Sequence, residues 1–163
     1  MTRLEIGTLA LAASSAALLV STQASAEAHE DLEAELATVH MSAADIVQAR
    51  RVTYYLTTQA VGQIKAGIEE GGDLRRTRFA AQLLVRWAQT LPSMFPEGTD
   101  IEGSRALPTV WSDRAGFEAA ATAYQDAAQA VMDTAETGDR EATNEAFFAM
   151  AATCQACHTA YRE

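Results

Sequence analysis

The chain reads FFAMAATCQACHTAY over residues 147–161, close to its C-terminus. In this stretch Phe147, Met150, Cys154, Cys157 and Tyr161 recur at intervals of three or four residues. Side chains at such intervals lie on one face of an α-helix. The stretch therefore predicts a helix that presents two cysteines on the same face as two aromatic residues and a methionine.

The five residues Cys154-Gln155-Ala156-Cys157-His158 form the pattern by which haem is attached in c-type proteins. Cys154 and Cys157 are the only cysteines of the chain. On a helix, both sulfurs can add to the two haem vinyl groups from one side, and the imidazole of His158 can then reach the iron. We therefore predict one haem c per chain, bound through Cys154 and Cys157, with His158 as the metal ligand.

Two other uses of this motif are weaker. A redox-active C-x-x-C pair normally opens a helix after a strand, where the helix dipole lowers a thiol pKa. Here the pair lies near the end of a helix, and no strand is expected. A zinc site needs about four ligands. Beyond the motif only His29 and His40 could serve, and both lie in an acidic N-terminal segment.

A first helix is expected to begin at Ser42 and to end at Gly71-Gly72, where glycine tolerates a left-handed helix end. Asp45 stands three residues after Ser42, which is close to a capping box. Aliphatic residues then recur at heptad spacing, and Arg50, Tyr54 and Thr57 stand in the same series. The series is Val47, Arg50, Tyr54, Thr57, Val61, Ile64 and Ile68. One face of this helix is therefore expected to pack inward.

A second helix is expected from Asp73 to about Leu91, where Pro92 and Pro96 end it. Its inward face carries Leu84, Trp87, Ala88 and Leu91. Residues 92–111 then form a connection that is long for so small a domain. Connections of this length are usually functional or wrap around something.

Ser112 or Asp113 can cap a third helix. Its inward positions are regular: Phe117, Ala121, Tyr124, Ala128, Val131 and Ala135. Gly138-Asp139 then makes the turn into the helix of the haem motif. Two short turns and one long connection thus join four amphipathic helices. This order predicts an all-α, up-down antiparallel four-helix bundle over residues 42–163, with one covalently attached haem c.

The composition fits one compact domain, because 48% of the 163 residues are hydrophobic and 21% are charged. Disordered and low-complexity classes are excluded. Asp and Glu number 22 against 12 Lys and Arg, which gives a net charge of −10. A chain this acidic repels phosphate backbones, so we expect no nucleic-acid partner.

Residues 1–26 have the features of a cleaved secretory signal peptide. Arg3 supplies a positive start, residues 6–20 are apolar, and Ala24-Ser25-Ala26 is an A-x-A cleavage site. The alternative is a membrane anchor, but the apolar run is about 15 residues, short of the roughly 20 that a spanning helix needs. We therefore expect a periplasmic product without a membrane anchor, whose residues 27–41 form a flexible arm.

The ligand at the sixth coordination position of the haem iron, opposite His158, determines the function. Tyr54 is expected opposite the iron, and a neutral phenol is a poor ligand. No methionine stands at the middle of a facing helix. We therefore predict five-coordinate iron with a shielded, apolar open face that admits NO and CO. The alternative is that Tyr54 only packs in the core.

Two other functional classes stay open. One is a six-coordinate electron-transfer cytochrome, with His40 or a methionine as the sixth ligand and a redox partner protein. The other is an enzyme such as a weak peroxidase. Peroxidases generally need a distal histidine or arginine to cleave O–O, and the distal face offers Tyr54 instead. We therefore expect a protein that is not an enzyme.

Three arginines are candidate haem contacts. Arg50 lies one turn before Tyr54, and a buried arginine needs an anion, which a haem propionate supplies. The alternative is a surface ion pair. Arg51 is a weaker second candidate. Arg162 follows His158 by four residues and can lie over the proximal face, unless the C-terminus is frayed.

Taken together, these motifs make the chain similar to cytochrome c-prime, the class II c-type cytochromes, over about residues 42–162. The similarity depends on the haem motif with Tyr161-Arg162 and on residues 50–54 with Gly62. Residues 95–99 and 108–113 add to it. The family implies a homodimer of four-helix bundles with five-coordinate haem c. It also implies NO and CO binding, poor O₂ binding, and roles in NO handling or electron transfer.

The resemblance also carries over site residues by position. Tyr54 matches the distal pocket residue, Arg50 the propionate-binding arginine, and Arg162 the basic residue beside the proximal histidine. Arg51 stands where many members carry Gln, which makes a propionate role for it less secure. Low-spin members place a methionine ligand at the position of Tyr54, and this chain has none there.

Overall fold

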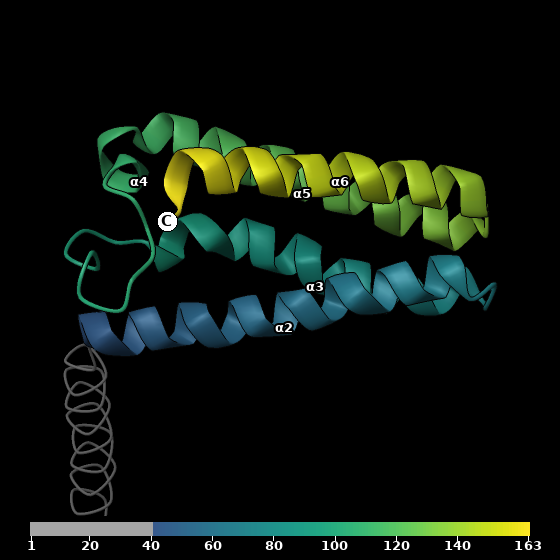
Figure 1. The fold of residues 1–163 in the computed structure, drawn as a ribbon, viewed down its shortest axis with the longest axis horizontal. Helices are drawn as coiled ribbons and strands as arrows, with labels where there is room; N and C mark the ends of the chain where they lie inside the picture. The colour runs from purple at the N-terminus through teal and green to yellow at the C-terminus, as the bar shows by residue number, and fades with distance from the viewer. Residues whose placement is uncertain (1–40) are drawn as a thin grey trace, which may run out of the picture. The chain divides into compact units, whose positions relative to one another are not determined.

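Residues 41–163 are described by a computed structural model (Figure 1). This part consists mainly of four long helices: α2 (Ala43–Glu69), α3 (Thr77–Thr90), α5 (Arg114–Thr137) and α6 (Arg140–Tyr161). Between residues 41 and 163 there is no strand, only an isolated bridge between Ala106 and Arg162. The predicted all-α four-helix bundle is confirmed. The predicted signal peptide, and the predicted arm up to residue 40, lie outside the described residues.

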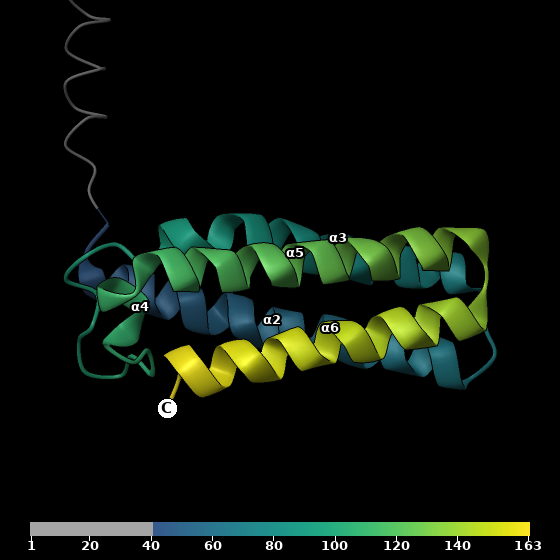
Figure 2. The same ribbon diagram turned by 90° about the horizontal axis from the view of Figure 1, so that it is seen from above.

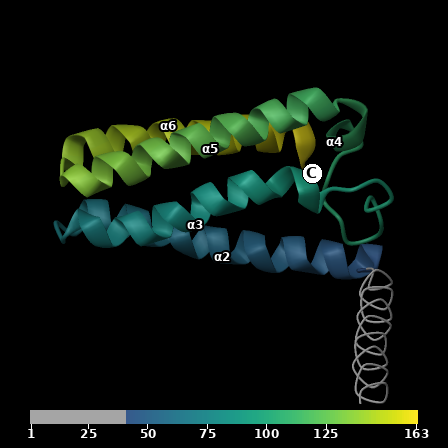
Figure 3. The same ribbon diagram turned by 180° about the vertical axis from the view of Figure 1, so that it is seen from behind.

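The helices run alternately up and down. Figures 1 and 2 together place α2 beside both α3 and α6, and diagonally opposite α5. The α5 helix packs along α3 and α6 for much of its length, whereas α2 meets α6 only sparsely. Figure 3 shows the two hairpin turns at one end of the bundle, with α4 (Thr109–Ser112) and the C-terminus at the other. The haem motif therefore lies at the end that the long connection crosses.

Side chains fix the starts of the helices as the sequence predicts. The hydroxyl of Ser42 accepts from the N–H of Asp45, and the Asp45 carboxylate accepts from the N–H of Ser42, which completes a capping box. The carboxylates of Asp113 and Asp139 cap α5 and α6, because each accepts a hydrogen bond from a backbone N–H in the first turn of its helix. Gly138, between these two helices, has a φ of 78°, a left-handed conformation that glycine adopts readily.

The second predicted helix differs in detail from its expectation. Asp73 caps a short 3₁₀ helix, η1 (Leu74–Arg76), which leads directly into α3. Pro92 does not simply stop α3 but stands in the first turn of another 3₁₀ helix, η2 (Leu91–Met94). A proline fits there because N–H groups of a first turn have no intrahelical partner. The connection 92–111 is therefore partly helical at both of its ends.

The core has two parts along the bundle. The larger cluster lies toward the hairpin turns and is built from α2, α3, α5 and α6, with Ile64, Leu84, Val131 and Met150 almost inaccessible to solvent. The second cluster lies toward the connection and includes Trp87, Leu91, Phe95, Val110, Phe117 and Ala121. None of the helices between residues 41 and 163 is long and apolar enough to cross a membrane.

Arg140, the first residue of α6, satisfies the end of α2. Its guanidinium donates to the carbonyls of Gly67 and Ile68 at 2.7 and 2.6 Å and to the carbonyl of Gly72 at 2.7 Å. The last carbonyls of a helix have no partner within it, and a cation is favourable at that end. One side chain thus joins the two hairpin ends of the bundle.

Candidate haem site

Residues of α2 and α6 line two cavities. Their volumes are about 350 and 470 Å³. Four residues line both of them: Tyr54, Cys157, His158 and Arg162. The smaller cavity opens toward the connection and is rich in arginine, and the larger extends into the bundle and also contacts Cys154. The motif residues therefore stand at the junction of a charged space and an aromatic one.

The two cysteines lie near the C-terminal end of α6, as predicted. Both are half-buried free thiols, and burial raises the pKa of each above that of an exposed cysteine. A raised pKa is the opposite of what an activated redox cysteine needs. Among residues 41–163 there is no group of three or more histidine, cysteine or acidic side chains placed to hold a metal ion. The geometry therefore favours haem attachment over the two alternative uses of the motif.

His158 shares the cavity-lining face of α6 with Cys157. Burial, followed by the positive charges of Arg162 and Arg105, lowers its pKa from the usual value. The Nη1 atom of Arg162 lies 3.5 Å from His158 Nε2. A neutral imidazole is the form that binds a metal. The surroundings of His158 thus favour the protonation state that a haem ligand requires.

Tyr54, which the sequence predicts opposite the iron, lines both cavities together with Cys157 and His158. Its ring packs edge-on against Trp87 with 5.2 Å between centroids. Burial raises the pKa of Tyr54 well above its usual value, so the phenol stays protonated. A protonated phenol is a poor iron ligand. Tyr54 is therefore a weak candidate for an iron ligand.

The wall of the larger cavity is largely apolar, as the sequence predicted for the distal face, but it also contains several polar groups. The larger cavity is lined by two phenols, Tyr54 and Tyr124, and by the hydroxyl-bearing side chain of Thr57. Trp87 also lines it, and its buried indole N–H has no hydrogen-bond partner. Sequence reasoning placed Tyr124 and Trp87 on inward faces but treated them as core residues. The sequence does not indicate which inward-facing positions border the cavity, so it could not assign these two residues to the site.

Arg50 is buried, and the alternative of a surface ion pair is wrong. Only 3% of its surface is exposed, and its partners are oxygens of the connection rather than carboxylates. Nη1 donates to the Met94 carbonyl at 3.1 Å and to Thr99 Oγ1 at 3.0 Å. Nη2 donates to the Thr99 carbonyl at 2.9 Å and to Ser104 Oγ at 3.3 Å. Arg50 lines the smaller cavity while it holds the connection in place.

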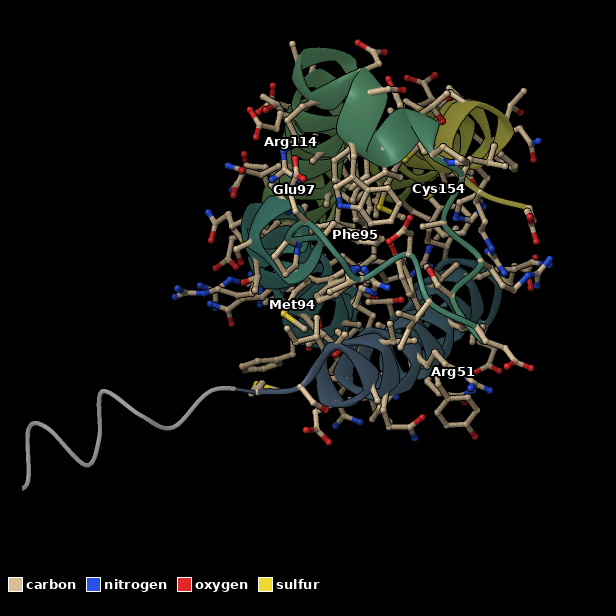
Figure 4. The ribbon with its side chains drawn as sticks, turned by 90° about the vertical axis from the view of Figure 1, so that its left-hand side faces the viewer. Arg51, Met94, Phe95, Glu97, Arg114 and Cys154 are labelled. Atoms are coloured by element: carbon tan, nitrogen blue, oxygen red, sulfur yellow. The ribbon has the colours of Figure 1, made fainter. Side chains whose placement is uncertain are left out.

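The guanidinium of Arg50 also stacks on an aromatic ring. Its Cζ atom lies 4.1 Å from the centroid of the Phe95 ring. Figure 4 looks onto this end of the bundle, with Phe95 near its centre and Arg51 on α2 toward its edge. Arg51 is exposed and lines the smaller cavity, as does Arg162. All three predicted arginines therefore border the same space.

Arg105 is a fourth arginine in this cavity, and the sequence analysis missed it. The Ala106–Arg162 bridge places it beside the end of α6. The Leu107 N–H donates to the Tyr161 carbonyl at 3.0 Å and strengthens this pairing. No periodic pattern marks a residue in a connection, so only the fold brings Arg105 to the site.

The last turn of α6 is anchored to the start of α5. The Tyr161 hydroxyl donates to Asp113 Oδ2 at 2.9 Å, while Asp113 also caps α5. Gly116 lies directly beneath this pair, and a Cβ atom there would collide with Asp113 Oδ2 and with the Tyr161 hydroxyl. This hydrogen bond and the Ala106–Arg162 bridge hold the end of α6, which argues against the alternative of a frayed end at Arg162.

The residues present fit a covalently attached haem. Two thiols and one imidazole lie on a single helix face, above a cavity whose walls are largely aromatic and apolar. The adjoining cavity offers guanidinium groups and no acidic side chain, which suits the propionates of a haem. The fold and this donor set define a c-type haem protein built on a four-helix bundle.

The comparison with known proteins identifies the family. The family model described as Cytochrome C' matches residues 45–162. The chain is 37% identical to the cytochrome c' of Rhodospirillum rubrum over 83 residues, which cover 50% of this chain and 56% of that protein. It is 39% identical to that of Alcaligenes xylosoxydans xylosoxydans over 102 residues, 62% of this chain and 68% of the relative. The chain belongs to the cytochrome c' family and binds haem c.

Solved structures agree with this assignment. The crystal structure of cytochrome c' from Thermochromatium tepidum superimposes with a TM-score of 0.70 at 27% identity, covering 76% of this chain and 98% of that one. Variants of the Alcaligenes xylosoxidans protein are solved with nitric oxide and with carbon monoxide bound, each at TM-score 0.68 and 28% identity. A further cytochrome c', at TM-score 0.71 and 25% identity, is described as having ligand-controlled dimer dissociation.

Proposed function

We propose that this chain binds small diatomic gases, NO and CO among them, at a haem iron held by His158 alone. The observation that carries the proposal is Tyr54, which lines both cavities together with Cys157 and His158 and whose phenol stays protonated. It occupies the place of a sixth ligand without being able to serve well as one. The NO and CO complexes of the Alcaligenes xylosoxidans variants support the same ligand class.

The alternative is six-coordinate iron that only transfers electrons. Met150 is the one methionine that lines either cavity. It stands eight residues before His158 on the same helix, about 12 Å along the axis at 1.5 Å per residue. Two ligands on opposite faces of one iron cannot come from such positions. The other candidate for this role, His40, lies outside the described residues.

The optical spectrum of the reduced holoprotein, with and without CO, tests the proposal. Five-coordinate iron predicts a broad α band and a clear change when CO is added. A sharp, split α band that does not respond to CO would establish the electron-transfer alternative instead. The measurement needs only purified protein matured with its haem.

We further propose that the protein is not an enzyme. In the part of the chain that the structure describes, His158 is the only histidine. A peroxidase generally places a histidine or arginine on the distal side. Of the two arginines that precede Tyr54 on α2, Arg51 is exposed and Arg50 donates through its Nη groups to the connection. Saturable peroxide turnover by the holoprotein would contradict this proposal.

We propose a periplasmic location. The covalent haem and the A-x-A sequence Ala24-Ser25-Ala26 both fit export followed by cleavage. The intact mass of protein recovered from the periplasm tests this proposal directly. The expected mass is that of a chain beginning at Glu27 plus one haem. A mass that includes residues 1–26 would contradict it.

We propose that two copies associate through α2 and α3. Tyr55 on α2 is 66% exposed and Phe79 on α3 is 70% exposed, and Leu56 and Leu83 are further exposed apolar residues on the two helices. The relative with ligand-controlled dimer dissociation supports a homodimer. Sedimentation of Phe79→Glu should show weaker association than wild type, whereas Phe148→Glu on α6 should not. Identical sedimentation of all three proteins as monomers would rule out the dimer.

A further inference from the structure

The smaller cavity contains an excess of positive charge that no acidic side chain in its lining balances. Four guanidinium groups line it, from Arg50, Arg51, Arg105 and Arg162, and no aspartate or glutamate does. This is notable because the whole chain carries a net charge of −10. Several cations around a space without an acid create a field that binds anions. The haem supplies such anions as its propionates.

Arg50 is poorly suited to this task because its hydrogen bonds are already made. A guanidinium has five N–H donors. In Arg50, both Nη atoms donate to oxygens of the connection, through four bonds of 2.9 to 3.3 Å. Only Nε is without such a bond. A two-pronged contact with a carboxylate needs a pair of neighbouring donors, which Arg50 does not have free.

Arg105, by contrast, has a fixed backbone and an accessible side chain. Its carbonyl accepts from the N–H of Glu163 at 3.0 Å, and the adjacent Ala106 pairs with Arg162. Its side chain is exposed, and only one of its nitrogens, Nη2, donates, to the Glu163 main-chain oxygen. Arg105 lines the same cavity as His158, the predicted iron ligand.

We propose that Arg105 binds a haem propionate through its guanidinium fork, and that Arg50 serves to hold the connection that carries Arg105. Ser104 links the two roles, because it accepts from Arg50 and immediately precedes Arg105. The proposal requires the haem but does not depend on gas binding. A negative result here therefore leaves the proposed function intact, and the CO test above leaves this proposal intact.

The test compares Arg105→Gln and Arg105→Lys in the holoprotein. Arg105→Gln is expected to shift the propionate bending band in the resonance Raman spectrum and to lower the reduction potential, because a cation near the haem favours the reduced iron. Arg105→Lys keeps the charge but not the fork. It should shift the Raman band while it retains most of the wild-type potential.

Arg86→Gln, an exposed change on α3 that does not border either cavity, controls for net charge. A Raman band that stays in place in Arg105→Gln, with a potential no lower than that of Arg86→Gln, would overturn the proposal. Measuring the reduction potential with added phosphate provides a second test. If phosphate changes the potential of wild type but not of Arg105→Gln, and the propionate band is the same in both, Arg105 binds a solution anion instead, and the proposal is wrong.

Discussion

At the scale of single residues, Tyr54 determines access to the iron. Its ring is fixed by the edge-on contact with Trp87 and lies on the wall of both cavities. We expect Tyr54→Ala to speed CO association roughly tenfold, which corresponds to about 1.4 kcal/mol of barrier. The measurement is flash photolysis of the CO complex. Tyr54→Phe keeps the ring and loses only the hydroxyl, so it should stay near the wild-type rate.

The two Tyr54 variants separate the effect of the ring's size on CO association from the effect of its hydroxyl. If Tyr54→Phe is as fast as Tyr54→Ala, the hydroxyl and not the ring controls entry. If neither variant differs from wild type, Tyr54 does not cover the iron. The buried, unpaired indole N–H of Trp87 is the reason to include the phenylalanine variant, because the distal wall contains polar groups that an apolar-pocket model ignores.

Gly116 is a residue where a single methyl group should disturb the haem end of α6. Its missing Cβ leaves room for the hydrogen bond between Tyr161 and Asp113. We expect Gly116→Ala to lower the free energy of unfolding by about 1–3 kcal/mol through overpacking. Urea unfolding measures this change. Adding Tyr161→Phe removes one of the two colliding groups and leaves the Asp113 carboxylate, so the double variant should lose somewhat less than the sum of the single changes.

At the scale of elements, the connection between α3 and α5 is held by Arg50. Thr99 is almost fully buried and accepts from that arginine twice, through its hydroxyl and its carbonyl. We expect Arg50→Gln to cost roughly 2–3 kcal/mol, because buried acceptors lose their donor. Limited proteolysis should then cut within residues 95–104 first. Arg51→Gln, an exposed change on the next residue, is the control and should leave both stability and cleavage unchanged.

The end of α2 depends on Arg140 in a comparable way. We expect Arg140→Ala to lower the free energy of unfolding by about 1–2 kcal/mol, since three carbonyls lose a charged donor. Arg78→Ala is a matched comparison, because Arg78 makes an ion pair with Glu136 in which both side chains are about half exposed. Such a pair contributes about 0.5 kcal/mol or less. Equal losses in the two variants would contradict the role given to Arg140.

Most element boundaries could be predicted from the sequence because local chemistry sets them. Ser42 and Asp45 form their capping box within one turn, and Gly138 adopts its left-handed conformation without help from the fold. The 3₁₀ helix after α3 could not be predicted in the same way. Pro92 is compatible both with a break and with a first helical turn, and only the packing of Leu91 and Phe95 in the core selects the second.

At the scale of the whole molecule, prediction of the site was complete only where the motif is local. Cys154, Cys157 and His158 are linked by helix spacing alone. Arg105 is 53 residues from His158 in sequence, and its approach depends on the pairing of the connection with the C-terminus. The contacts of Arg50 were hard to predict for a related reason. Its burial could be predicted, but the carbonyls that would satisfy it could not.

The haem should stabilise one side of the molecule more than the other. The α2 helix meets α6 sparsely, and residues of both helices line each cavity, whereas α5 packs extensively on α3 and α6. We therefore expect a haem-free double variant, Cys154→Ala with Cys157→Ala, to remain helical but to melt at a lower temperature. Hydrogen exchange should rise most in the first half of α2, residues 43–56, and least in α5. The holoprotein measured under the same conditions is the reference. A uniform rise over all four helices would show that the haem supports the bundle as a whole instead of its α2 side.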